Sequence, residues 1–162
     1  ILMRMDVTSV IRIEKIYSDK DIIDNYFEIK PEDLLEMGVK NSNAGIEVLC
    51  RYRRISTEAF LFYNEDKAIG IFGVREDSPH SAVPWMISES LDGIETSEFI
   101  KCSVKVIEQY KQKYDEMHNY TSCLNTKSHK WLEYLGFVID KTDVVIMNNI
   151  SWYRFRWRRE DE

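Results

Sequence analysis

The sequence is poor in cysteine, proline and glycine, and each shortage excludes a class of protein. Its three cysteines, Cys50, Cys102 and Cys123, are odd in number and widely spaced, which fits neither a disulfide framework nor a zinc site. Three prolines and six glycines among 162 residues exclude collagen-like and low-complexity chains. No apolar run approaches the roughly 20 residues needed to cross a bilayer. We therefore expect reduced thiols and no contact with a membrane.

Positive charge is also in short supply. The chain has 22 Lys and Arg against 28 Asp and Glu, a net charge of −6. Nucleic acids and anionic lipids reward clustered basic residues, so neither is an expected partner. Residues 1–4 lack the pattern of a secretory signal, which predicts a cytoplasmic protein. The length predicts one domain over residues 1–162 that buries about 70% of its unfolded surface.

The spacing of apolar residues changes along the chain and predicts alternating strands and helices. The expected strands cover residues 10–17, 59–63, 67–74, 83–88, 120–124, 137–139 with 144–147, and 151–159. The expected helices begin after Ser18, at Pro31, near Ala44, at Thr96 or Ser97, and at Thr126, and the fourth carries an apolar stripe as far as Met117. The order is β-α-α-(α)-β-β-β-α-β-α-β-β. We expect an α/β (α+β) fold with a mixed sheet of six or seven strands flanked by helices.

The segment from Asn125 to Phe137 carries the most specific local pattern. Asn125 ends a strand, Ser128 follows three residues later, and an apolar helix face leads to Gly136-Phe137. Together with the element order, this spacing resembles the GCN5-related N-acetyltransferase (GNAT) fold over nearly the whole chain. The resemblance implies that the fourth and fifth strands run side by side and then diverge, leaving a wedge for the pantetheine arm of acetyl-CoA. A side chain such as Trp85 or Trp131 filling that wedge would argue against catalysis.

The same resemblance implies a set of site residues. The cofactor-binding positions would be Met86, Ile87, Ser88, Asp92, Gly93, Thr96, Ser97, Asn125 and Ser128. Backbone N–H groups near Met86 and Ile87 would polarise the thioester carbonyl. Glu89, or a water, would take the proton from the attacking amine, although Glu89 also reads as a solvated surface acid. The acceptor would be a protein or a small amine, and an acidic cleft would favour a cationic one.

Two departures from the family pattern bear on activity. The loop from Ser88 to Thr96 has one glycine, no basic residue and three carboxylates, where active members have a Gly-rich turn that holds the pyrophosphate. Two like charges about 5 Å apart repel by roughly 3 kcal/mol at an effective dielectric constant near 20, so we expect weak cofactor binding unless these acids point outward. The position of the family's tyrosine acid is Leu132. Tyr134 lies about 200° around the helix and should face elsewhere.

A narrower resemblance leaves a second function open. Trp85-Met86-Ile87-Ser88-Glu89, followed by a long helix and Asn-Thr-x-Ser-His, is similar to short acetyltransferase-like proteins of tailed phages, some of which belong to the internal virion set. That similarity implies a place in the host cytoplasm or the virion. The alternative to catalysis is therefore a scaffold for virion assembly or host-protein binding, and self-association of the chain also stays open.

The C-terminal strand supports a third and weaker hypothesis. Arg154, Arg156 and Arg158 fall on one face of it and form a basic stripe. The stripe would bind nucleic-acid phosphates, a CoA 3′-phosphate or an acidic partner, or else would protect an edge strand from aggregation. The three histidines have no paired ligand spacing, so we expect no metal site.

Overall fold

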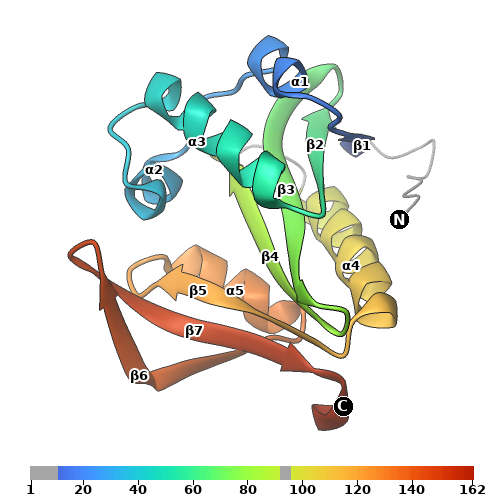
Figure 1. Ribbon diagram of the computed structural model, residues 1–162, viewed down its shortest axis with the longest axis vertical. Helices are drawn as coiled ribbons and strands as arrows, with labels where there is room; N and C mark the ends of the chain where they lie inside the picture. Colours follow the sequence, from blue (N-terminus) through green and yellow to red (C-terminus); the bar gives the residue numbers. More distant parts are fainter. Residues whose placement is uncertain (1–10, 92–95) are drawn as a thin grey trace.

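The computed structural model describes residues 11–91 and 96–162, and within them seven strands form one mixed sheet in the order β1-β2-β3-β4-β5-β7-β6. The strands are β1 (Ile11–Lys15), β2 (Glu58–Asn64), β3 (Lys67–Ser78), β4 (Ser81–Ser88), β5 (Glu116–Ser122), β6 (Val138–Met147) and β7 (Ile150–Arg158). Neighbours are antiparallel except β4 and β5, which are parallel. The predicted α/β fold with a mixed sheet flanked by helices is confirmed (Figure 1).

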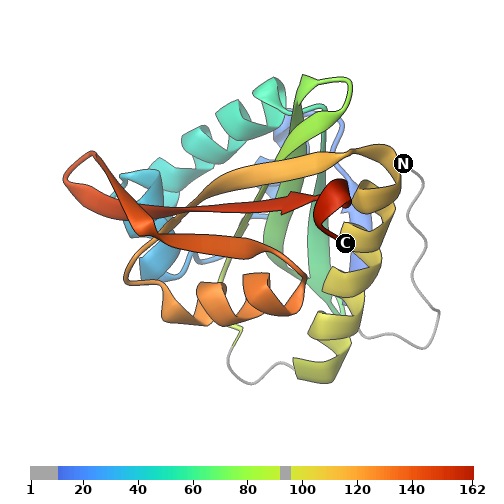
Figure 2. The ribbon, with the colours of Figure 1, turned by 90° about the horizontal axis from the view of Figure 1, so that it is seen from below.

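Helices cover both faces of the sheet (Figure 2). They are α1 (Asp19–Asp24), α2 (Pro31–Met37), α3 (Ser42–Ile55), α4 (Thr96–Lys113) and α5 (Thr126–Tyr134), and a short 3-10 turn covers Arg159–Asp161. Strand β2 shows how the faces divide, because Phe60 and Phe62 join the core beneath α4 and α5 while Leu61 and Tyr63 join the core beneath α1 and α3. This two-residue alternation explains why nearly every residue of β2 is buried.

Strands β4 and β5 pair over two positions and then separate. The pairs are Ser81 with Glu116 and Ala82 with Met117. The next β4 residue facing β5 is Pro84, which has no N–H to give, and its carbonyl accepts a bond from the side-chain Nδ2 of Asn119 at 2.8 Å. The parallel ladder therefore ends at this proline. The expected divergence of the two strands is confirmed.

Some boundaries and neighbours differ from the sequence predictions. Helix α4 ends at Lys113 and β5 begins at Glu116, although the apolar stripe continues to Met117, because Tyr114 and Met117 are buried in the same core on either side of the boundary. Strand β7 lies between β5 and β6, so the expectation that the arginine stripe belongs to an edge strand is wrong. Gly38 after α2 and Gly136 after α5 have positive φ angles of 74° and 98°, a conformation that favours glycine at helix ends.

Candidate functional site

A cavity of about 460 Å³ opens where β4 and β5 diverge, and α2, α3, α4 and α5 also line it. Trp85 and Trp131 belong to its walls. The Trp85 ring packs against Gly73, where an added Cβ would lie 2.7 Å from the ring, and its Nε1 donates to Ser56 Oγ at 2.8 Å. The Trp131 ring centroid lies 6.0 Å from that of Phe99. Both indoles are thus held by neighbouring elements, and the wedge remains open.

The β4 wall presents backbone groups to this cavity. Carbonyls and N–H groups of alternate residues face the same side of a strand, so Met86, two residues after Pro84, turns both toward the cavity. Ile87 turns its backbone to Ile71 of β3, and its side chain is buried in the core beneath α1 and α3. Of the two predicted carbonyl-polarising positions, Met86 is the one with a backbone N–H aimed at the wedge.

Helix α2 holds the end of β4. Ser88 is completely buried, its N–H donates to Asp33 Oδ2 at 2.9 Å, and its carbonyl accepts from the Lys30 N–H at 3.0 Å. Lys30 Nζ lies 3.2 Å from Ser88 Oγ and 3.4 Å from Asp33 Oδ2. The polar groups of Ser88 are therefore engaged within the protein. Pro31 at the first helical position gives α2 its start, as the sequence predicted.

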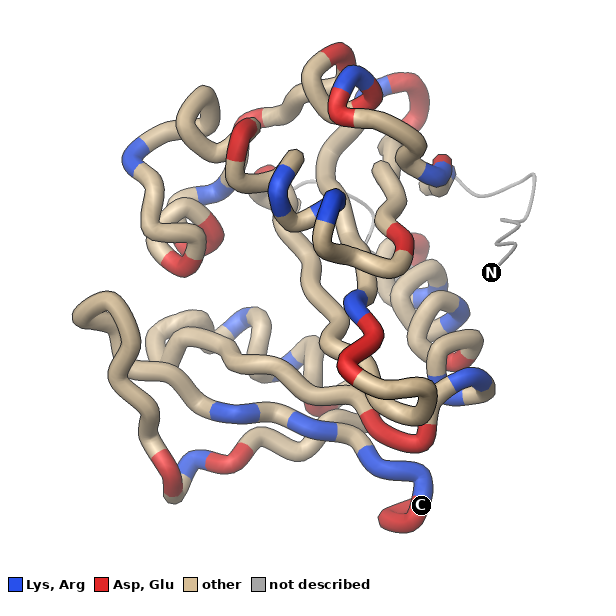
Figure 3. The backbone as a smooth tube through the Cα atoms, viewed as in Figure 1, with Lys and Arg blue, Asp and Glu red and all other residues tan. Residues whose placement is uncertain are grey.

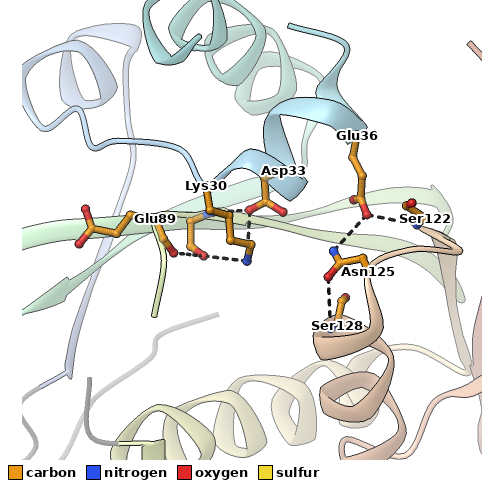
Figure 4. Close-up of polar contacts among 8 residues, drawn as sticks. Lys30, Asp33, Glu36, Glu89, Ser122, Asn125 and Ser128 are labelled. Atoms are coloured by element: carbon orange, nitrogen blue, oxygen red, sulfur yellow. Dashed lines mark hydrogen bonds and ion pairs between the residues drawn. The ribbon is translucent and has the colours of Figure 1, made fainter. Parts of the chain in front are cut away.

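The same helix also holds the end of β5 (Figure 4). Glu36 Oε1 accepts the Ser122 N–H and the Asn125 Nδ2, each at 3.1 Å. Asn125 caps α5, and its Oδ1 accepts the Ser128 N–H at 3.4 Å. Asn125 and Ser128 thus lie together on the cavity wall. Asp33 and Glu36, one turn apart on α2, reach across the open end of the wedge to its two strands.

Sequence reasoning missed Asp33 and Glu36. Their partners lie 55 and 86 residues away, so no local pattern identifies them. The one usable signal is their spacing of three residues, which places two carboxylates on one side of a short helix.

Burial sets the electrostatics of this pair. It raises the pKa of Asp33, and the nearby Lys30 ammonium opposes the shift. Burial likewise raises the pKa of Glu36, while the bonds from Asn125 and Ser122 oppose it. Both carboxylates are shielded from water, so protonation is easier than for an exposed acid. Burial also raises the pKa of the cavity-lining Cys102 thiol to about 11, which keeps it protonated and a weak nucleophile near neutral pH.

Glu89, the expected proton acceptor, lies elsewhere. Its Oε2 is 3.1 Å from Lys67 Nζ on β3, its N–H donates to Ile69 O, and it does not line the cavity. Asp92 and Gly93 lie outside the described residues, and Thr96 and Ser97 form the first turn of α4. Tyr134 is 65% exposed and outside the cavity, as helix geometry predicted, whereas Leu132 lines it.

Basic and acidic residues are interspersed over most of the fold, and three arginines lie along β7 (Figure 3). Arg154 and Arg156 are exposed on β7, and Arg158 Nε lies 3.6 Å from Glu116 Oε2. These arginines do not line the cavity. Among the described residues, no group of three His, Cys, Asp or Glu side chains is arranged to hold a metal ion. No helix in the described part of the chain combines the length and apolar character needed to span a membrane.

Comparison with protein-family models gave no match, and no curated protein matched the chain. Solved structures did match. An acetyltransferase from Bacillus subtilis in complex with CoA has a TM-score of 0.59 at 14% identity, over 91% of this chain and 98% of that chain. A GNAT-family acetyltransferase from Streptococcus pneumoniae has a TM-score of 0.61 at 12% identity, over 91% and 99%. Spermidine N-acetyltransferase from Vibrio cholerae in complex with CoA and spermine has a TM-score of 0.63 at 12% identity, over 93% and 96%. The chain therefore has the fold of the GNAT acetyltransferases.

Proposed function

We propose that the protein is an acetyl-CoA-dependent N-acetyltransferase whose cofactor lies in the wedge between β4 and β5. The observation that carries this proposal is the wedge itself, because β4 and β5 pair over two positions and then enclose a cavity of about 460 Å³. A parallel pair that simply continued would leave no space for a ligand. Two of the structures with this fold were determined in complex with CoA, which supports the same assignment.

The cavity walls carry polar groups that suit the two amides of a pantetheine arm. The backbone N–H and carbonyl of Met86 face away from β3 and toward the cavity. Thr121 and Trp131 line the cavity, and Thr121 Oγ1 and Trp131 Nε1 are buried without a hydrogen-bond partner among the residues that the structure describes. A buried polar atom without a partner is costly, so these two atoms are available to a ligand. Asn125 and Ser128 complete the wall at the start of α5.

The remaining cofactor contacts belong to the proposal as well. The first turn of α4, with Thr96 and Ser97, would face the pyrophosphate, together with the preceding Asp92 and Gly93. When bound, acetyl-CoA supplies a reactive acetyl thioester. The Met86 N–H would donate to the carbonyl oxygen of that thioester.

We propose a small cationic amine as the acceptor. Two carboxylates, Asp33 and Glu36, line the cavity together with two basic side chains, Lys30 and Arg75, and Lys30 Nζ lies 3.4 Å from Asp33 Oδ2. Among the described residues Glu36 has no ion-pair partner, and a carboxylate without a cationic partner favours a positively charged ligand. The Vibrio cholerae protein with this fold, which was determined with spermine, supports the same substrate class.

Calorimetric titration with acetyl-CoA tests the cofactor site. We expect a dissociation constant below about 100 μM, which corresponds to roughly −5.5 kcal/mol, and a matching rise in Tm. Thr121→Val removes the unpartnered hydroxyl at nearly constant volume and should weaken binding several-fold, since one hydrogen bond contributes about 1 kcal/mol. Thr142→Val, at an exposed position on β6, should leave the dissociation constant unchanged.

A second candidate function is a non-catalytic scaffold of the phage type, acting in virion assembly or in binding a host protein. One observation favours it: the amides of Ser88 and Ser122 at the open end of the wedge already donate to α2 carboxylates. The acetyl-CoA titration separates the two functions. Absence of heat and of any Tm shift at millimolar acetyl-CoA would exclude the transferase and leave the scaffold.

A further inference from the structure

Glu36 has the geometry of a positioned base in addition to its structural role at the end of β5. Both of its hydrogen bonds, from the Ser122 N–H and from Asn125 Nδ2, go to Oε1. Among the described residues Oε2 has no hydrogen-bond or ion-pair partner. The carboxylate is thus fixed through one oxygen at the end of β5, while the other is available in the cavity that the side chain lines.

An independent observation concerns a polar atom on the adjoining wall of the cavity. Thr121, one residue before Ser122 on β5, is 3% exposed, and its hydroxyl has no hydrogen-bond partner within residues 11–91 and 96–162. Aromatic side chains stand on the other wall, where the ring centroids of Tyr52 and Trp85 lie 5.4 Å apart in an edge-to-face contact. A carboxylate beside aromatic rings is a combination that binds ammonium groups.

The pKa of Glu36 is set by burial and by the charged groups around it. Burial is the largest cause of the raised pKa of Glu36. Asp33, on the same helix, raises this pKa a little further, and Lys30 lowers it. The Tyr52 phenol on α3 is the other titratable group that interacts with it, and Ser122 and Asn125 approach it as neutral donors. A base works best when its pKa lies near the operating pH, so a raised carboxyl pKa improves proton transfer.

We propose that Glu36 Oε2 is the group that takes the proton from the acceptor amine, a role that rests on the transferase function proposed above. The ammonium of the acceptor gives one proton to Oε2 and becomes a neutral amine. The amine nitrogen then forms a bond to the acetyl carbon as the carbon–sulfur bond breaks. The second amine proton goes to the leaving thiolate, and Glu36 returns its proton to water. Glu89 has no part in these steps, because its carboxylate is paired with Lys67.

The variant Glu36→Gln isolates this role. Glutamine keeps an oxygen that can accept from Ser122 and Asn125, and it loses the charge and the basic oxygen. The matched control is Glu32→Gln, an exposed acid on the same helix. Each variant is measured in three ways: calorimetric binding of spermidine to the cofactor-free protein, calorimetric binding of acetyl-CoA, and thiol release with spermidine, putrescine or Nα-acetyl-lysine from pH 5.5 to 9.

We expect Glu36→Gln to bind spermidine at least tenfold more weakly and to bind acetyl-CoA as the wild type does. Its thiol release should fall by about 10² to 10⁴, the usual contribution of a positioned base. Wild-type activity should rise with pH as Glu36 loses its proton, and the variant should lack this acidic limb. Glu32→Gln should match the wild type in all three measurements.

Two outcomes would overturn the inference, and they are distinguishable. If Glu36→Gln binds spermidine and releases thiol within threefold of the wild type, Glu36 is not the base although the transferase function stands. If the wild type binds no acetyl-CoA, or releases no thiol with any of the three amines, the transferase function fails and the role of Glu36 fails with it.

Discussion

At the scale of single residues, the buried carboxylates of α2 connect stability to pH. Asp33 is 3% exposed, and its Oδ2 lies 2.9 Å from the Ser88 nitrogen and 3.4 Å from Lys30 Nζ. Burial outweighs both partners and raises its pKa. Between the pKa of the unfolded chain, near 3.9, and the raised pKa of the folded chain, the folded state binds more protons. The free energy of unfolding contributed by Asp33 therefore falls as pH rises through that window.

The variant Asp33→Asn should show this dependence directly. Asparagine does not titrate and can still accept from Ser88, so its free energy of unfolding relative to the wild type should improve as pH rises from 4 to 8. Glu76→Gln is the opposite case, because bonds from Tyr114 and Lys113 lower the pKa of Glu76. The advantage of the wild-type Glu76 should be present above the unfolded pKa and be lost as pH falls. Urea unfolding at several pH values measures both, and slopes of the same sign would contradict the argument.

Residues with local roles were predictable from sequence, and residues with distant partners were not. Asn125 and Ser128 were predictable because an N-cap and its helix are adjacent in the chain. Gly136 was predictable because a helix end favours a residue that adopts positive φ. Glu36 was not predictable, because its role depends on a contact with Ser122 across the sheet.

At the scale of elements, the connection between β6 and β7 is a two-residue turn. Met147 pairs with Ile150, so Asn148 and Asn149 form the loop, and their φ angles are 53° and 62°. Two successive left-handed residues define a type I′ turn, which matches the twist of a hairpin. In the sequence these asparagines stand between two apolar runs, which is the pattern of such a turn.

Substitution of Asn149 should therefore follow backbone preference. Asn149→Gly should leave the urea midpoint unchanged or raise it, since Asn-Gly is a favoured pair for this turn. Asn149→Val should lower the free energy of unfolding by about 1 kcal/mol, because a β-branched residue resists positive φ. Equal stability of the two variants would exclude a type I′ turn at this position. Asn149 is suited to the test because it does not line the cavity, whereas Asn148 does.

The elements themselves were predictable in type and order, and less so in their ends and neighbours. The spacing of apolar residues identified the strands and helices, because the buried side chains recur every two residues in a half-buried strand and every three or four residues in a helix. The end of α4 was misplaced because Tyr114 and Met117 stay buried across the change from helix to strand. The position of β7 inside the sheet was missed because a single sequence does not state which strands pair.

At the scale of the whole molecule, the sheet consists of two parts joined at one end. Strands β1 to β4 form one part, and β5, β7 and β6 form the other. Two residue pairs join them at the narrow end of the wedge, and α2 joins them at the open end through Asp33 and Glu36. The family resemblance predicted that β4 and β5 diverge, but it did not predict that α2 joins their open ends.

Hydrogen exchange should detect the gap between the two parts. The amides of Trp85 and Ile87 face β3 and belong to its ladder, whereas the Met86 amide faces the cavity. We expect Met86 to exchange at least tenfold faster than its two neighbours in the free protein, and to slow when acetyl-CoA is added. Equal protection of all three amides in the free protein would mean that the wedge is closed in solution.

The missing N–H of Pro84 determines how far the two parts can approach each other. Any other amino acid at position 84 would restore a donor next to His118 and let the parallel ladder gain another rung, at the expense of the ligand space beyond it. How far the wedge extends between the two strands thus depends on one imino acid in the main chain. Substitutions of the side chains that line the cavity would alter its shape, whereas a substitution of Pro84 would alter its depth.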